Sequence, residues 1–243
     1  MTKKINIAAI GTGRMGSVHV ANLVQKIPEA NLSAICDIRL PVAQAVADEL
    51  GIQRVVQDYH ELLADQEIQA VLIATSTPTH AQIIQDAAAA GKHIFCEKPL
   101  ALDLESIDTA LAAVKKAGVK LQVGFNRRFD KHFRQAREIV HSGELGRTSM
   151  LLITNRDPQL PAMEFLRASG GLFLDMTIHD FDMARFQIGE VEEIYAAGSV
   201  LIDSELNSFG DLDTAAVTLK FCDGTLGLID NSRQSVYGYD QRL

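Results

Sequence analysis

Cysteine is scarce in this sequence. The chain of 243 residues has only Cys36, Cys96 and Cys222, which are widely separated and set among apolar residues. An odd number at such spacing argues against a disulfide framework and against a cysteine metal site. We therefore expect three buried thiols and a reducing, cytoplasmic location.

The sequence also lacks a long hydrophobic run. The first apolar stretch, Ile5 to Ile10, follows two lysines but stops at Gly11, and Arg14 comes soon after. It is too short for a signal peptide core and is better explained as a first β-strand. No later stretch could span a membrane, so we expect no membrane partner.

Positive charge is in the minority. The chain has 23 Lys and Arg against 31 Asp and Glu, a net charge of -8, and no basic run. This balance weighs against binding to nucleic acid or to anionic membranes. A hydrophobic fraction of 47% with 22% charged residues excludes disordered and collagen-like classes and allows one large domain or two modest ones.

The amino-terminal segment has the order strand, glycine turn, helix. The apolar run Ile5 to Ile10 leads into the turn at Gly11, Gly13 and Gly16, and a helical pattern follows over Val18 to Gln25. Three glycines alone are weak evidence, because they can occur in any loop. In this context they predict a phosphate-binding turn, where glycine lets the backbone approach a pyrophosphate at a helix amino terminus.

A second strand pattern, Leu32 to Cys36, ends at Asp37, about twenty residues beyond the glycines. A dinucleotide-binding fold places an acid there for the adenine ribose hydroxyls. The carboxylate would repel a 2'-phosphate and so favours NAD over NADP, although Arg39 nearby weakens that preference. The alternative is an α/β domain with the same turn and no nucleotide.

Strands and helices continue to alternate, which predicts a parallel sheet with helices on both faces and ligands at the carboxyl ends of the strands. Two strand ends carry polar residues, in the segments 75–80 and 97–99. Lys98 could orient a substrate hydroxyl there, or it could be a surface lysine in a turn. The further elements expected are helices at 41–50 and 79–90 and strands at 70–74 and 93–96.

The segment 170–185, GGLFLDMTIHDFDMAR, places Asp175 and His179 four residues apart in a helical pattern. That spacing puts both side chains on one helix face, where a carboxylate can orient an imidazole as a general base. Alternatively, Asp175 caps the helix and His179 is half-buried. A metal site using His179, Asp180 and Asp182 is a third possibility, but no Cys or second His lies nearby.

Three motifs occur in order along the chain: the glycine fingerprint, GKHIFCEKPLA at 91–101 and GGLFLDMTIHDFDMARF at 170–186. Together they resemble the Gfo/Idh/MocA family of NAD(P)-dependent sugar and polyol dehydrogenases. The third motif, with NRDP at 155–158 before it and NSRQSVYGYD at 231–240 after it, looks most like the inositol 2-dehydrogenase branch. The resemblance covers essentially the whole chain.

The resemblance implies a role for particular residues. Catalytic residues would be Lys98, Asp175 and His179, with no metal. Cofactor contacts would come from the glycine loop, the ribose acid and the strand-end loops: Gly11, Gly13, Arg14, Met15, Gly16, Asp37, Arg39, Thr75, Pro78, His80, Glu97 and Lys98. Substrate contacts would come from Lys98, Arg127, Asp157, Asp175, His179 and Tyr237.

The family fold is a Rossmann domain followed by an α/β domain with an open, largely antiparallel sheet. We expect the first domain at 1–123 and the second at 124–243, with a helix at 131–141 and strands at 148–154, 194–202, 214–221 and 225–230. Members of the family are longer than this chain. The resemblance therefore implies a second domain that is truncated at its carboxyl end, and a homo-oligomer, either a dimer or a tetramer.

The activity that the resemblance implies is NAD-dependent oxidation of a cyclic polyol, with myo-inositol and its 2-keto product, scyllo-inosose, as the first expectation. Another inositol isomer or an aldose is an alternative substrate. A different class of function also stays open: a shortened remnant or regulatory protein that binds NAD without turnover.

Overall fold

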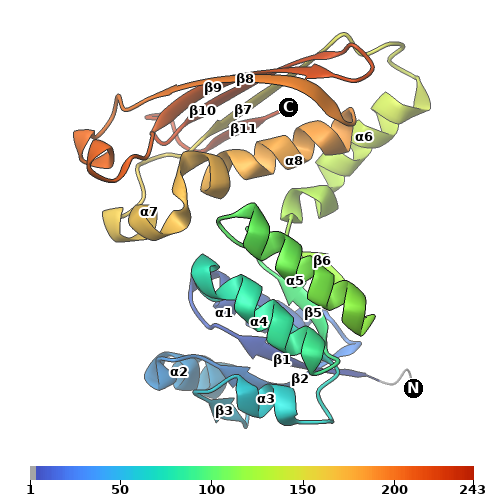
Figure 1. Cartoon of the computed structure of the whole chain (residues 1–243), viewed down its shortest axis with the longest axis vertical. Helices are drawn as coiled ribbons and strands as arrows, with labels where there is room; N and C mark the ends of the chain where they lie inside the picture. Colours follow the sequence, from blue (N-terminus) through green and yellow to red (C-terminus); the bar gives the residue numbers. More distant parts are fainter. Residues whose placement is uncertain (1–3) are drawn as a thin grey trace. The chain divides into compact units, whose positions relative to one another are not determined.

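The computed structural model describes residues 4–243, so Met1 to Lys3 of the expected first domain lie outside the described residues. The chain forms two compact units, Met1–Gly124 and Phe125–Leu243. Each unit has its own sheet (Figure 1).

The first unit contains a six-stranded sheet in the order β3-β2-β1-β4-β5-β6, with every pairing parallel. This is the strand order of a dinucleotide-binding fold. Its strands are β1 Ile5–Ile10, β2 Ala30–Cys36, β3 Val55–Val56, β4 Ala70–Ile73, β5 His93–Cys96 and β6 Leu121–Val123. Its helices are α1 Arg14–Lys26, α2 Leu40–Leu50, α3 His60–Ala64, α4 Thr77–Ala89 and α5 Leu104–Ala117.

Both faces of this sheet are buried, which explains why its strands are nearly continuous apolar runs. In β1, Ala9 packs with α1 and α2 through Val20 and Ala43. Its neighbours in the strand, Ala8 and Ile10, belong to the core on the opposite side, which α3, α4 and α5 cover. The carboxyl ends of β1, β2, β4 and β5 carry the predicted cofactor loops.

The second unit contains a five-stranded sheet in the order β11-β7-β10-β9-β8. Only β7 and β10 pair in parallel, so the sheet is largely antiparallel, as expected. Its strands are β7 Met150–Arg156, β8 Val191–Ser199, β9 Thr214–Phe221, β10 Leu226–Ser232 and β11 Asp240–Arg242. Its helical segments are η1 Asn126–Phe129, α6 Lys131–Ser142, α7 Met163–Ser169, η2 Phe173–Thr177, α8 Ile178–Gln187 and η3 Ser204–Phe209.

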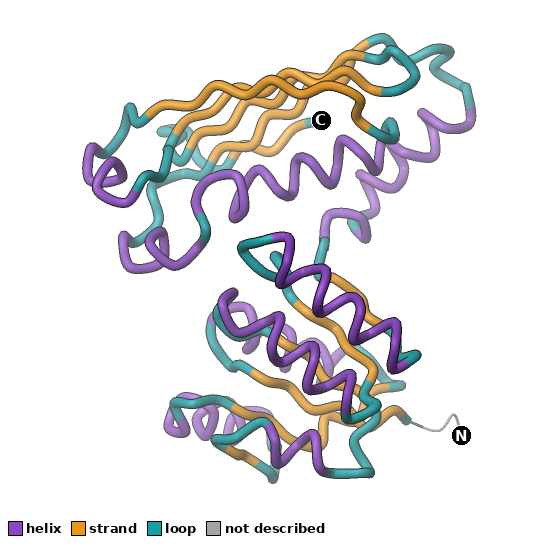
Figure 2. Tube along the Cα trace, viewed as in Figure 1, coloured by secondary structure: helices purple, strands orange, loops and turns teal. Residues whose placement is uncertain are grey.

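One face of this sheet packs on α8 and forms the core of the unit (Figure 2). Ile153, Val217 and Ile229 point to that face and contact Met183 and Ala184 of α8. Burial alternates along β7, β9 and β10, as the period of two of a half-covered strand requires.

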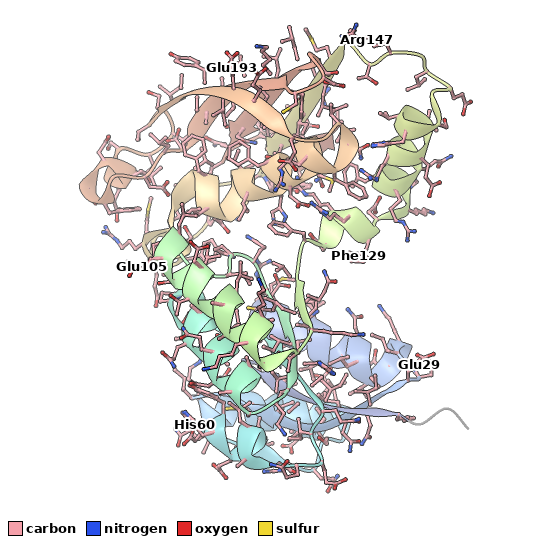
Figure 3. All side chains as sticks on the ribbon, turned by 45° about the vertical axis from the view of Figure 1, so that its right-hand side comes forward. Glu29, His60, Glu105, Phe129, Arg147 and Glu193 are labelled. Atoms are coloured by element: carbon pink, nitrogen blue, oxygen red, sulfur yellow. The ribbon has the colours of Figure 1, made fainter. Side chains whose placement is uncertain are left out.

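The opposite face of the sheet is exposed and partly apolar. Tyr195, Thr218, Leu228 and Leu152 are cross-strand partners in one row, and the three large apolar members are 71%, 41% and 56% exposed in the order Tyr195, Leu228, Leu152. Figure 3 labels Glu193 on β8, whose register partner Lys220 makes an ion pair with it.

The expectation of three buried thiols is wrong for Cys222. Cys36 and Cys96 are buried in strands of the first unit, but Cys222 is exposed because it lies just after β9, where the chain turns toward β10. Burial raises the pKa of the Cys36 thiol to about 12. Over residues 4–243, no helix combines the length and the apolar character that a membrane crossing needs.

Candidate active site

The glycine loop brings β1, α1 and β4 very close together. Gly11 has φ +94°, and a Cβ built on it would lie 2.5 Å from the carbonyl oxygen of Ala74. A Cβ on Gly16, inside the first turn of α1, would lie 2.1 Å from the carbonyl oxygen of Gly11. Only glycine fits at these two positions. Arg14 and Met15 lie between them and are exposed.

Asp37 connects the glycine loop to the end of β2. Its Oδ2 accepts hydrogen bonds from the backbone N–H (2.9 Å) and the hydroxyl (3.0 Å) of Thr12, and its Oδ1 accepts one from the Arg39 N–H (2.9 Å). Burial raises the pKa of this carboxyl, but these hydrogen bonds outweigh burial and hold the pKa below its ordinary value. A carboxylate has about four acceptor positions. Capacity therefore remains for a ribose hydroxyl.

The loops after β4 and β5 are joined by His80. Its Nδ1 lies 2.8 Å from the carbonyl oxygen of Pro99, and its Nε2 lies 3.1 Å from that of Thr75. His80 is 1% exposed. Both ring nitrogens thus face backbone carbonyl groups of the two loops, one of them in Pro99, next to Lys98. The expected contact of His80 with the cofactor stays a prediction. Pro78 is exposed in the first turn of α4.

Glu97 has a partner that the sequence did not suggest. Its Oε1 lies 2.5 Å from Nε2 of His19, in α1, and its Oε2 accepts a hydrogen bond from the Lys98 N–H at 3.2 Å. The His19 ring also contacts the edge of Phe95. This pair fixes the backbone just before Lys98, whose side chain is half-buried. The only sequence signal was a histidine three residues after the last glycine of the fingerprint.

In the second unit, Asp175 and His179 do not share one regular α-helix. Asp175 lies in the π-helical segment η2, and His179 lies in α8, which follows directly. Four residues are slightly more than one α-helical turn and slightly less than one π-helical turn. The passage from the π-helical segment to α8 therefore keeps both side chains on one face. Both are half-buried, and the His179 ring meets Phe125 edge-on at 6.4 Å between centroids.

Asp175 is not the cap of this segment. The N–H of Leu172, at the amino end of η2, donates instead to Oδ1 of Asp211 at 2.7 Å. Asp175 Oδ2 accepts a hydrogen bond from Nη1 of Arg233 at 3.2 Å. The capping interpretation of Asp175 is therefore wrong, because Asp211, distant in sequence, already provides the acceptor.

A buried polar cluster surrounds Asp180, the neighbour of His179. Its carboxylate accepts hydrogen bonds from Arg127 (2.6 Å), from Asn155 (3.0 Å to Oδ2) and from Asn231 (2.8 Å). Asn155 and Asn231 are register partners at the ends of β7 and β10, and Asn231 also accepts from Thr177 at 2.6 Å. Burial raises the pKa of Asp180, while these donors oppose the shift. The cluster fixes α8 to the strand ends.

The three predicted substrate contacts outside the catalytic motif have different surroundings. Arg127 is buried and paired with Asp180. Asp157 is half-buried just after β7, and its N–H donates to the carbonyl oxygen of Ser232. Tyr237 is 65% exposed and donates its hydroxyl to Asp240 at 2.7 Å. Their contacts with a polyol remain predictions.

The proposed metal ligands are used elsewhere. Asp180 is held by the cluster just described, and Asp182 pairs with Arg128 at 2.7 Å. Among residues 4–243, no group of three or more His, Cys, Asp or Glu side chains is arranged to hold a metal ion.

Comparison with known families matches residues 5–125 to an oxidoreductase family with an NAD-binding Rossmann fold, GFO_IDH_MocA, and residues 133–243 to the GFO/IDH/MocA carboxyl-terminal domain. The chain belongs to the Gfo/Idh/MocA family. The expected family, fold class, enzyme class and NAD cofactor are thereby confirmed.

Individual relatives carry polyol names. The chain is 50% identical to a myo-inositol 2-dehydrogenase of Thermotoga maritima, over 98% of the chain and 72% of the relative. It is 44% identical to an inositol 2-dehydrogenase of Rhizobium meliloti, over 98% and 72%. The crystal structure of scyllo-inositol dehydrogenase from Lactobacillus casei with bound NAD(H) and scyllo-inositol matches with a TM-score of 0.90 at 33% identity, again over 98% and 72%.

Proposed function

We propose that this protein oxidises a cyclic polyol with NAD+, and that myo-inositol, converted to its 2-keto product, is the preferred substrate. The observation that carries the proposal is the 50% identity with a myo-inositol 2-dehydrogenase across 98% of the chain. Retention of Lys98, Asp175 and His179 in their motifs supports it.

The first unit fits a dinucleotide. Gly11 and Gly16 have no side chains that would keep a pyrophosphate away from the backbone of the turn. Asp37 can still accept a hydrogen bond from a ribose hydroxyl. When bound, NAD+ supplies the acceptor for the hydride that leaves the substrate carbon. Thr75, Glu97 and the other loop residues expected to contact the cofactor lie on the strand ends of the same unit.

Three side chains carry the proton chemistry. His179 takes the proton from the reacting hydroxyl as general base. Asp175 orients the imidazole and stabilises its cationic form. Lys98 donates a hydrogen bond to the hydroxyl and stabilises the negative charge that develops on its oxygen. Arg127, Asp157 and Tyr237 are assigned to the remaining hydroxyls.

The exposed sheet face supports a homo-oligomer. Tyr195, Leu228 and Leu152 form an apolar row on the face away from α8. Apolar surface of this kind marks an interaction site. We assign it to contact between copies of the chain, and we place the protein in the cytoplasm because two of its thiols are buried and unpaired.

NADH formation tests the proposal. Purified protein is incubated with NAD+ and each of a panel of inositols and aldoses, and binding of NAD+ is followed by thermal stabilisation. We expect turnover that is highest with myo-inositol. Higher turnover with another isomer or an aldose would reassign the substrate. Stabilisation by NAD+ with no turnover on any polyol would contradict the proposal and favour a protein that only binds the nucleotide.

A further inference from the structure

Arg233 is an arginine with no exposure to solvent. It follows β10 directly, is 0% exposed, and is the bulkiest of the fully buried side chains among the described residues. Its backbone N–H donates to the carbonyl oxygen of Asp213 at 2.8 Å. Arginine is almost never fully buried unless its charge is paired. The role of Arg233 therefore depends on which carboxylates it meets.

Two carboxylates face the guanidinium. Asp175 Oδ2 lies 3.2 Å from Nη1, and Asp211 Oδ2 lies 4.0 Å from Nη2. The Nε and Nη2 atoms have no hydrogen-bond partner among residues 4–243, so within that range the guanidinium makes its hydrogen bond to Asp175. The Asp211 side chain is fixed by the N–H groups of Leu172 and Leu212.

This arrangement is built around the amino end of η2. Asp211 holds the first turn of the segment at Leu172, and Arg233 holds the carboxylate that the segment presents at Asp175. Arg233 directly follows Ser232, the last residue of β10, which pairs with Arg156 of β7 in the sheet. The sheet therefore fixes the backbone at Arg233. The position of the Asp175 carboxylate is thus set by residues from three separate parts of the chain.

We propose that Arg233 is a positioning residue for the acid and base pair of Asp175 and His179. The inference rests on the proposed function of that pair. Arg233 holds the Asp175 carboxylate in place, and its permanent positive charge offsets part of the negative charge that Asp175 directs at His179. A fully uncompensated carboxylate would favour the imidazolium, which cannot accept a proton.

The other charges in the second unit near His179 are compensated in pairs. On α8, Asp180 is paired with Arg127 of η1 and Asp182 with Arg128 of η1. In η2 the acidic residue is Asp175, and its carboxylate is paired with Arg233 from beyond β10 at 3.2 Å. Removing the charge of Arg233 therefore leaves the Asp175 carboxylate without this counter-charge.

The test measures the pH dependence of kcat/KM in Arg233→Gln and Arg233→Lys. We expect Arg233→Gln to move the midpoint of the acid limb upward by about one pH unit and to lower kcat/KM, because His179 holds its proton more tightly. Arg233→Lys keeps the charge and should keep the midpoint near that of the wild type. Arg185→Gln, which removes an exposed arginine from α8, is the matched control and should not move it.

A double-mutant cycle separates this role from a structural one. In the Asp175→Asn background, Arg233→Gln should move the midpoint clearly less than in the wild type, since the carboxylate that Arg233 holds in place is gone. A midpoint unchanged by Arg233→Gln alone, or a shift of undiminished size in the Asp175→Asn background, would overturn the proposal. If Arg233→Gln does not fold, Arg233→Lys carries the test: an upward shift of about one pH unit in this variant, although the charge is kept, would also overturn the proposal.

An NMR titration of the His179 ring gives the same information without turnover. The ring signal, assigned with His179→Gln, should titrate about one pH unit higher in Arg233→Gln than in the wild type. If no polyol is oxidised but this shift is seen, the proposed function fails and the link between Arg233 and His179 stands. If the wild type oxidises a polyol but Arg233→Gln shows no shift, the proposed function stands and the link between Arg233 and His179 fails.

Discussion

Asp180 and Arg127 form a buried ion pair, with 2.6 Å between Oδ1 and Nη1 and side-chain exposures of 0% and 10%. Arg127, which was expected to contact substrate, thus pairs its positive charge with Asp180 inside the second unit. The same carboxylate receives the amide groups of Asn155 and Asn231. The pair fixes α8, and with it His179, to the ends of β7 and β10.

Asp180→Asn should strongly destabilise the protein, because it leaves the Arg127 guanidinium buried without a counter-charge. We expect a loss of about 3–5 kcal/mol in the free energy of unfolding, measured by urea denaturation. Glu190→Gln is the control, since its pair with Arg185 is more than half exposed on both sides. That change should cost less than about 1 kcal/mol. Equal effects of the two variants would contradict the structural role of Asp180.

Asp37→Ser should change cofactor preference. Removing the carboxylate abolishes its repulsion of a 2'-phosphate and leaves Arg39, 3.7 Å from it and exposed, able to attract that phosphate. We expect the ratio of kcat/KM with NAD+ to that with NADP+ to fall on the order of a hundredfold. The further change Arg39→Ala in that background should reduce use of NADP+. A ratio unaffected by Asp37→Ser would show that this acid does not face the ribose.

Asp213 should give the second unit an acid-sensitive stability. Burial raises the pKa of this carboxyl, but hydrogen bonds from the N–H groups of Leu201, Ile202 and Asp203 and from the Thr214 hydroxyl outweigh burial and lower it. A carboxyl with a lowered pKa in the folded state stabilises above its ordinary value of 3.8 and loses that contribution as the pH falls below it.

The variant Asp213→Asn measures this contribution. The wild type should exceed it by about 2–3 kcal/mol in free energy of unfolding near pH 7, as expected for hydrogen bonds to a charged group. The difference should narrow when urea denaturation is repeated at about pH 3. A difference that is the same at both pH values would show that the charge of Asp213 is not what stabilises this loop.

The apolar row on the exposed sheet face should control self-association. Leu228→Glu places a charge in the middle of the row formed with Leu152 and Tyr195. We expect a lower mass in sedimentation equilibrium than for the wild type, because a desolvated charge opposes association. Val236→Glu, at a residue that is 92% exposed outside the strands, should leave the mass unchanged. The assignment of this face fails if both variants keep the wild-type mass.

Much of the fold could be predicted from the sequence because its periodicity is strong. The strands Ile5–Ile10, His93–Cys96 and Thr214–Phe221 have the bounds expected from their apolar patterns. The start of α1 was placed four residues late, at Val18 rather than Arg14, since a glycine at position 16 usually interrupts a helical pattern. Here Gly16 lies inside the helix because the turn requires close contact with Gly11.

The site was less accessible to sequence reasoning. Lys98, Asp175 and His179 stand out through local motifs, but their supports come from distant segments. His19 supports Glu97 from α1, and Arg233 holds Asp175 from beyond β10. Pairing across such separations is decided by tertiary packing, which local periodicity does not record. The π-helical turn at η2 likewise has no signal in the apolar pattern.

The initial rate of NADH formation from myo-inositol, compared between the wild type and His179→Ala, tests the central claim most directly. We expect turnover by the wild type and a rate lower by roughly two to four orders of magnitude in the variant, as for loss of a general base. Thermal stabilisation by NAD+ should be the same in both, because His179 lies outside the dinucleotide-binding unit. A variant that keeps a rate within a few-fold of an active wild type would contradict the assignment of His179 as the base.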